Sequence, residues 1–150
     1  MIWLAALIGI RLTDPNNMDM MFIWDSITYL GGPFGTAWMV LISLVFVKGL
    51  DHLPGRYLLF LIPPAIVNIL VWTNPLHHLI YQVFDIDGSK IVFGPLMFVS
   101  GAVSYCYLAS AVAIMIRFAV KSSSKLYMRQ GFLFAIGALI PLVVNCLLYT

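Results

Sequence analysis

The chain has 150 residues, of which 62% are hydrophobic and 9% are charged, and its formal net charge is +2. A soluble domain carries about a quarter charged residues, and a fold of this length cannot hide so much apolar surface from water, so the expected solvent is lipid. The small net charge gives no indication of nucleic-acid binding, and Cys106 and Cys146 both lie inside apolar runs, where we expect packing rather than a disulfide.

The first apolar stretch, residues 1–12, is about 18 Å long as a helix, which is short for a hydrocarbon core of about 30 Å. It lacks the basic start and cleavage site of a signal peptide, so we interpret it as the second half of a spanning helix. The next segment, residues 20–47, is long enough to span with a tilt, and its only charge is Asp25. Gly31 and Gly35 within it have the GxxxG spacing that favours a close helix contact.

The third segment, residues 57–73, contains Pro63 and Pro64 near its middle. Two successive prolines remove two backbone donors, so this helix is expected to bend there. Asn68 lies at membrane depth, where an amide needs a hydrogen-bond partner, and we expect that partner on a neighbouring helix.

The second half of the chain begins with residues 76–90, which are expected to form the longest loop. Gly94-Pro95 then opens a fourth segment that runs to about Phe118, because proline is well placed in a first helical turn. The basic stretch that follows, residues 117–129, is expected to be another loop.

The fifth segment, residues 131–149, has Pro141 at mid-span and Asn145 four residues later. Pro141 predicts a second bend, and Asn145 is a second amide at membrane depth. Together the segments predict an all-α, polytopic transmembrane helical bundle with four full spans and a partial one at the N-terminus. Residues 1–150 then form a single domain, which we interpret as a fragment of a larger one.

The distribution of lysine and arginine predicts the orientation. The connectors around residues 48–56 and 117–129 hold six of the eight basic residues, whereas the other two loops hold only Arg11 and Lys90. Basic residues in short loops favour the cytoplasmic side. We therefore predict a multi-pass plasma-membrane protein with a cytoplasmic N-terminus and an external C-terminus.

A set of short motifs follows in order along the chain. They are Gly32 with Trp38, the run Thr73-Asn74-Pro75-Leu76-His77-His78, Gly94-Pro95 ahead of Ser104-Tyr105, the run Tyr127-Met128-Arg129-Gln130, and Pro141 with Asn145. This ordered set resembles the seven-helix N-terminal sensory region of bacterial and archaeal histidine kinases. The resemblance covers roughly residues 20–150, or about five of the seven helices.

The resemblance implies a sensory input domain for an unidentified ligand, in the membrane of a bacterium or archaeon. Its implied partner is a cytoplasmic kinase or other output domain. Membrane lipid is a further expected partner, and nucleic acid is not expected. The resemblance leaves open whether the chain forms a homodimer. The sequence shows no phospho-acceptor histidine helix, nucleotide-binding box or nucleophile–base pair, so we expect no catalysis in this chain.

A small transporter or a membrane anchor subunit of a redox complex is the alternative function. A transporter predicts an internal repeat, and none is visible in the sequence. A redox anchor predicts a bound chromophore. We expect no cofactor, because no histidine lies inside a span to hold a haem.

The candidate signal-sensing residues Trp72, Asn74, His77 and His78 are expected to form the outer lip of the bundle. An unperturbed histidine titrates at about pH 6.5, so the pair is a candidate for sensing external pH or binding a metal ion. The alternative is that the motif only ends a helix among lipid headgroups. Adjacent histidines on a helix point in different directions, so we predict no metal site unless the loop folds back.

Asp25 is a further sensing candidate, because a carboxylate within a membrane segment is by default a functional hypothesis. It is also close enough to the interface to be hydrated without a function. The other polar and proline positions are interpreted as helix-packing or hinge residues, namely Pro63, Pro64, Asn68, Pro141 and Asn145.

Overall fold

The computed structural model of the chain describes residues 2–14, 16–84 and 91–148, with side chains up to residue 140. The elements follow in the order α1 (Ile2–Leu12), α2 (Met18–Lys48), a 3-10 helix (Gly55–Leu61), α3 (Ile62–Trp72), α4 (Asn74–His77), β1 (Tyr81–Val83), β2 (Val92–Phe93), α5 (Pro95–Lys121) and α6 (Lys125–Leu148).

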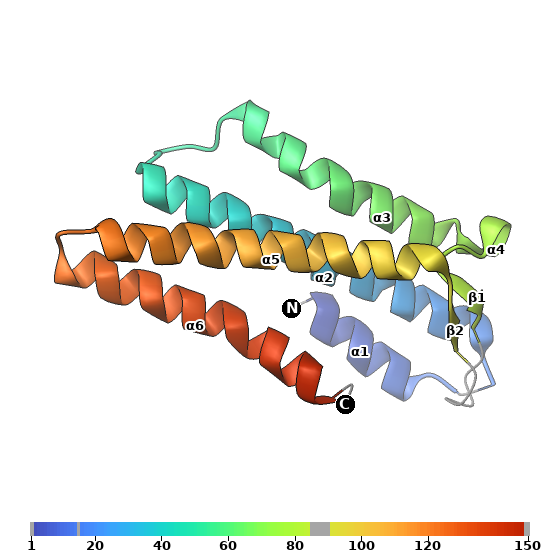
Figure 1. The fold of residues 1–150 in the computed structure, drawn as a ribbon. Helices are drawn as coiled ribbons and strands as arrows, with labels where there is room; N and C mark the ends of the chain where they lie inside the picture. The colour runs from blue at the N-terminus through green and yellow to red at the C-terminus, as the bar shows by residue number, and fades with distance from the viewer. Residues whose placement is uncertain (1, 15, 85–90, 149–150) are drawn as a thin grey trace.

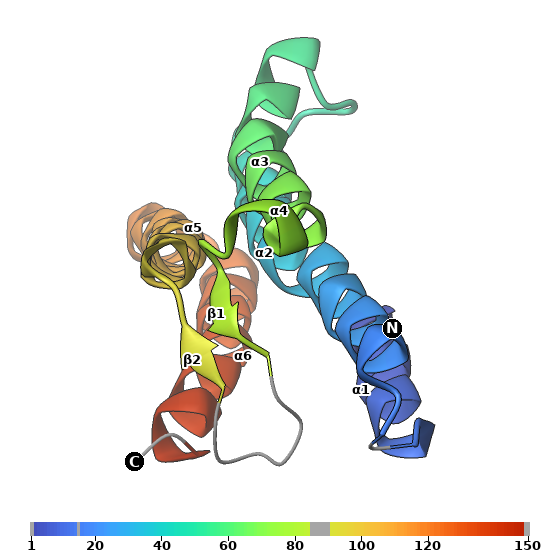
Figure 2. The same cartoon turned by 90° about the vertical axis from the view of Figure 1, so that its right-hand side faces the viewer.

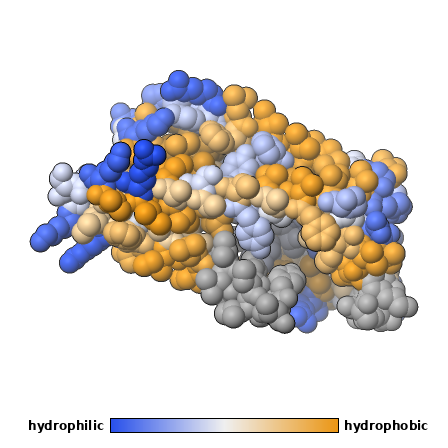
Figure 3. Space-filling view, viewed as in Figure 1, coloured by the Kyte–Doolittle hydropathy of each residue, from blue (hydrophilic) through white to orange (hydrophobic). Residues whose placement is uncertain are grey.

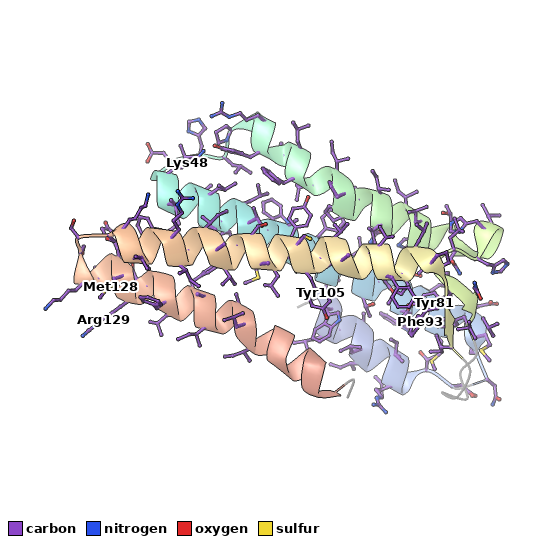
Figure 4. All side chains as sticks on the ribbon, viewed as in Figure 1. Lys48, Tyr81, Phe93, Tyr105, Met128 and Arg129 are labelled. Carbon is purple, nitrogen blue, oxygen red and sulfur yellow. The ribbon has the colours of Figure 1, made fainter. Side chains whose placement is uncertain are left out.

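The long helices lie side by side with α2 at the centre of the bundle (Figure 1). Helix α2 contacts α1, α3 and α5, and α5 in turn contacts α6. The two ends of the bundle differ in chemistry. One end, here called the hairpin end, carries β1, β2 and the turn between α1 and α2 (Figure 1). The other, here called the basic end, carries Lys48 and Arg129 (Figure 4).

Three helical stretches of the described chain are long and apolar enough to cross a membrane, namely Met18–Lys48, Gly55–Trp72 and Pro95–Lys121, and α1 is a shorter apolar helix. Apolar side chains cover much of the surface in Figure 3, as expected where lipid replaces water. The structure thus agrees with a helical membrane bundle but does not confirm four full spans. The last of the four expected full spans, residues 131–149, corresponds to α6, whose last side chains lie outside the described residues.

The prediction of a loop over residues 117–129 is wrong. Helix α5 continues to Lys121, and α6 begins at Lys125. Lysine and arginine are good helix formers, and their long side chains reach the membrane interface from a helix end. A cluster of basic residues therefore did not need to interrupt the helices.

The predicted loop over residues 76–90 contains strand β1, and β2 follows it at Val92–Phe93, so the all-α expectation omits a small sheet. Strands β1 and β2 pair antiparallel, with Tyr81 opposite Phe93 and Val83 opposite Val92. Three residues of β1 and two of β2 are too few for the alternation of a strand to be visible in the sequence. Residues 85–90 of the predicted loop lie outside the described residues.

Helices α1 and α2 approach closely at two glycines. A Cβ atom at Gly31 would lie 2.6 Å from the Cβ of Trp3, and one at Gly9 would overlap the indole ring of Trp24. The predicted GxxxG contact is therefore half right, because Gly31 meets α1 whereas a Cβ at Gly35 would have no neighbour within 4 Å.

Pro63 and Pro64 stand in the first turn of α3, where the 3-10 helix gives way to α-helix. The carbonyl of Phe60 would accept a hydrogen bond from the N–H of residue 63 or 64, and proline has none. The hydroxyl of Tyr107 on α5 donates to this carbonyl instead, at 2.8 Å. The proline pair thus marks a change of helix type, and the carbonyl that it leaves without a backbone donor joins the 3-10 helix to α5.

Replacing Tyr107 with phenylalanine should destabilise the bundle, because the Phe60 carbonyl then loses its donor. We expect a loss of about 0.6 to 1.7 kcal/mol, as found for hydrogen bonds between membrane helices, measured by unfolding in mixed detergent micelles. Tyr105→Phe is the matched control, since Tyr105 lies on the same helix with 49% of its surface exposed. Equal losses in the two variants would contradict the assigned role of Tyr107.

Candidate functional site

The chain reverses direction at the end of α3 in a single short helical turn. Thr73 ends α3, and Pro75 occupies the first turn of α4, where its missing N–H costs nothing. The turn closes at His78, which adopts the left-handed conformation with φ 52° and donates its N–H to the Asn74 carbonyl at 2.8 Å. Histidine is one of the few side chains that tolerate this conformation.

The side chain of Asn74 is buried and holds the strand that follows. Its Oδ1 atom accepts hydrogen bonds from the backbone N–H groups of Ile80 at 2.9 Å and Tyr81 at 3.0 Å. Its Nδ2 atom donates to the Tyr81 carbonyl at 3.0 Å. The amide therefore pairs with β1 much as a neighbouring strand would, and it fixes the hairpin to the end of α3.

The ring of His77 fixes the same turn. Its Nδ1 atom accepts a hydrogen bond from the Leu79 N–H at 3.0 Å, and its Nε2 atom lies 3.2 Å from the Thr73 hydroxyl. The Thr73 hydroxyl itself donates to the Ile69 carbonyl at 2.7 Å. These contacts assign the ring proton to Nε2, since Nδ1 must keep its lone pair to accept.

Gly94 brings the start of α5 to this turn. Its N–H donates to the Ile80 carbonyl at 2.7 Å, and the Leu96 N–H donates to the Leu79 carbonyl at 3.1 Å. A Cβ atom at Gly94 would overlap that Leu79 carbonyl, so only glycine fits. The 73–78 motif and Gly94-Pro95 therefore form one joint, in which the end of α3, the hairpin and the start of α5 meet (Figure 2).

A second network joins this hairpin to α2. The hydroxyl of Tyr81 donates to a carboxylate oxygen of Asp25 at 2.8 Å. The hydroxyl of Tyr29 lies 2.7 Å from the Tyr81 hydroxyl and 3.2 Å from the sulfur of Met97 on α5. The Tyr81 hydroxyl is the donor to Asp25, and the Tyr29 hydroxyl is the donor to the Met97 sulfur. We call these four residues the tyrosine network.

The tyrosine network lies in an apolar environment. Tyr29 and Tyr81 are buried in one core cluster with Val67, Val71 and Ile80, and the ring of Phe84 stands edge-on to Tyr81 with 5.3 Å between centroids. Burial raises the pKa of Tyr81 well above its usual range, and the Asp25 carboxylate and Tyr29 act in the same direction. The hydroxyl therefore keeps its proton, and it remains a donor to Asp25, at every physiological pH.

The described part of the chain holds no group of three His, Cys, Asp or Glu residues placed to bind a metal ion. The site thus offers a buried carboxylate, two buried hydroxyls and an amide clamp. These groups join the hairpin to α2 and to the turn that follows α3.

The model of one protein family, described as the N-terminal 7TM region of histidine kinase, matches residues 1–150. The chain belongs to this family. The match extends the resemblance, which rests on motifs in residues 20–150, to the whole chain, α1 included. No curated protein and no solved structure matches it.

The structure brings together some of the candidate residues of this 7TM region and separates others. Asp25, Asn74 and His77 all contact the hairpin or the turn before it. Trp72 and His78 are exposed at the surface. The Asn68 side-chain nitrogen is buried, and the predicted partner on a neighbouring helix is absent from the described residues. The side chains of Pro141 and Asn145 lie outside the described residues.

Tyr29, Tyr81 and Met97 are members of the site that the sequence did not indicate. Tyr81 and Asp25 are separated by 56 positions in the chain. No local pattern links them, and Tyr81 stands in what was expected to be a loop. The carboxylate of Asp25 needs a hydrogen-bond donor if it is buried, and this requirement was the one feature of the sequence that pointed to a partner such as Tyr81.

Substitution of Gly94 by alanine should disrupt the joint, because the added methyl group would overlap the Leu79 carbonyl. We expect a loss of about 2–4 kcal/mol in the free energy of unfolding and faster hydrogen exchange at the Ile80 and Tyr81 amides. Gly101→Ala is the matched control, since a Cβ at Gly101 on α5 has no neighbour within 4 Å. Unchanged exchange in the Gly94 variant would show that the joint is not rigid.

Proposed function

We propose that this chain is the membrane-embedded sensory input domain of a histidine kinase or related sensor. The family match supports the class of protein. The observation that carries the mechanism is the hydrogen bond from Tyr81 to Asp25, which joins the hairpin to the central helix of the bundle. The chemistry then resides in a cytoplasmic output domain and not in this chain.

In this proposal the hairpin end faces outward and receives the signal, while the basic end faces the cytoplasm of a bacterium or archaeon. The joint anchors the hairpin to α3 through Asn74 and to α5 through Gly94. The tyrosine network adds the contact with α2. A signal that displaces the hairpin would therefore alter the positions of three helices together.

Such a mechanism requires two packings of the bundle with different affinity for the signal. One packing has the hairpin docked, with the Tyr81 to Asp25 hydrogen bond made. In the other the hairpin is released and this bond is broken. A hydrogen bond to a carboxylate contributes about 1.5–3 kcal/mol, which corresponds to a change of roughly ten- to a hundredfold in the ratio of the two packings.

The test uses basal autophosphorylation of the full-length protein in lipid vesicles, because no ligand is then needed. Tyr81→Phe and Asp25→Leu should each change the activity by about tenfold or more, in the same direction. The double variant should change it no further, since both substitutions break one contact. Tyr105→Phe, away from the network, should leave it unchanged. Additive effects of the two substitutions would refute the shared contact.

The orientation is tested by labelling of single cysteines in intact cells. Asn16→Cys lies in the α1–α2 turn at the hairpin end, and Ser123→Cys in the turn between α5 and α6, and both positions are exposed. A membrane-impermeant maleimide should label the cysteine at position 16 and not the one at position 123. The opposite pattern would reverse the proposed topology.

A further inference from the structure

A groove lies at the basic end, where the end of α2 meets the turn between α5 and α6. Its volume is about 720 Å³, which is within the usual range for a small-molecule site. Its lining includes Phe46 and Lys48 from α2, Phe118 from α5, Ser122 from the turn and Tyr127 from α6. It is separate from the joint and the tyrosine network, which occupy the hairpin end.

One wall of the groove is aromatic. The rings of Phe46, Phe118 and Tyr127 stand edge-on to one another, with centroids 5.5 to 6.3 Å apart. Tyrosine is enriched where a membrane protein crosses from hydrocarbon to headgroup. This packing also gives Tyr127, from the Tyr127-Met128-Arg129-Gln130 motif, a place in the groove. An acyl chain or a glycerol backbone is suited to such a wall.

The polar side of the groove carries an excess of positive charge. The Lys48 ammonium donates to the Tyr57 hydroxyl at 2.6 Å and lies 5.1 Å from the centre of the same ring. Within the described residues it has no ion-pair partner. Asp51 also lines the groove and, among the residues that the structure describes, is the one carboxylate at the basic end. Six basic side chains belong to the same end, namely Lys48, Arg56, Arg117, Lys121, Lys125 and Arg129.

We propose that this groove binds an anionic membrane lipid, with its phosphate at Lys48 and Ser122 and its apolar part against the three aromatic rings. Charge complementarity favours an anionic headgroup, because the amine of a zwitterionic lipid would add a cation to an end already rich in them. The bound lipid contacts α2, α5 and α6, so it stabilises the packing of these three helices. The inference concerns lipid recognition and stands whether or not the hairpin receives a signal.

The test compares the full-length protein in nanodiscs of phosphatidylcholine alone and in nanodiscs containing phosphatidylglycerol. Native mass spectrometry measures how much phosphatidylglycerol stays bound to the protein as its content in the nanodiscs is raised. The melting temperature of the protein is measured in parallel. We expect phosphatidylglycerol to raise the melting temperature and Lys48→Gln to weaken its binding by about fivefold. Lys121→Gln, the same charge change at the same end but outside the groove lining, should weaken binding less than twofold.

Equal weakening by the two lysine substitutions would overturn the groove and leave only a diffuse cationic surface. Equal melting temperatures in the two kinds of nanodisc would overturn the lipid preference. Stabilisation of the lipid-free protein in detergent by inorganic phosphate alone would assign the site to free phosphate instead. Phe118→Leu gives a second measure that keeps every charge, and it should weaken phosphatidylglycerol binding through the loss of the aromatic wall.

Discussion

Backbone groups inside a bilayer need hydrogen-bond partners from the protein itself, and this constraint explains two places where the chain interrupts its helices. At Pro63 and Pro64 the carbonyl without a backbone donor is that of Phe60, and a hydroxyl from α5 reaches it. Beyond Thr73 the N–H groups of the first strand residues are met by the amide of Asn74. In both cases a polar side chain from another part of the chain replaces the missing backbone hydrogen bond. The same bond then connects two separate elements of the fold.

The general architecture follows from composition and helix punctuation. The apolar stretches and the positions of Gly94-Pro95 and Thr73 were enough to place most helix ends to within a few residues, because proline and short polar runs restrict where a helix can begin or end. The boundaries near Lys121 and Lys125 were misjudged. Charge marks the membrane interface, but it does not by itself end a helix.

The candidate site was only partly predictable. Asp25 and Asn74 attract attention in the sequence because each places a polar group in or next to an apolar helix. Their partners depend on how the chain folds back, since Tyr81 reaches Asp25 only after α3 has returned to the hairpin end. The Asn74 clamp shows why the 73–78 motif and Gly94 belong together, a relation that their sequence separation conceals. In the described chain these residues act on one structural joint.

The close packing of α5 and α6 means that a rotation of α5 would carry α6 with it. A Cβ at Gly131 would lie only 2.8 Å from the Cβ of Ala119. Only residues 122–124 connect the two helices. Helix α5 has 27 residues and is therefore about 40 Å long. A rotation of about 5° at its Pro95 end would displace the far end by roughly 3.5 Å over that length. A small rotation of α5 next to Gly94 would thus produce a larger displacement at the far end of α5, and α6 would move with it.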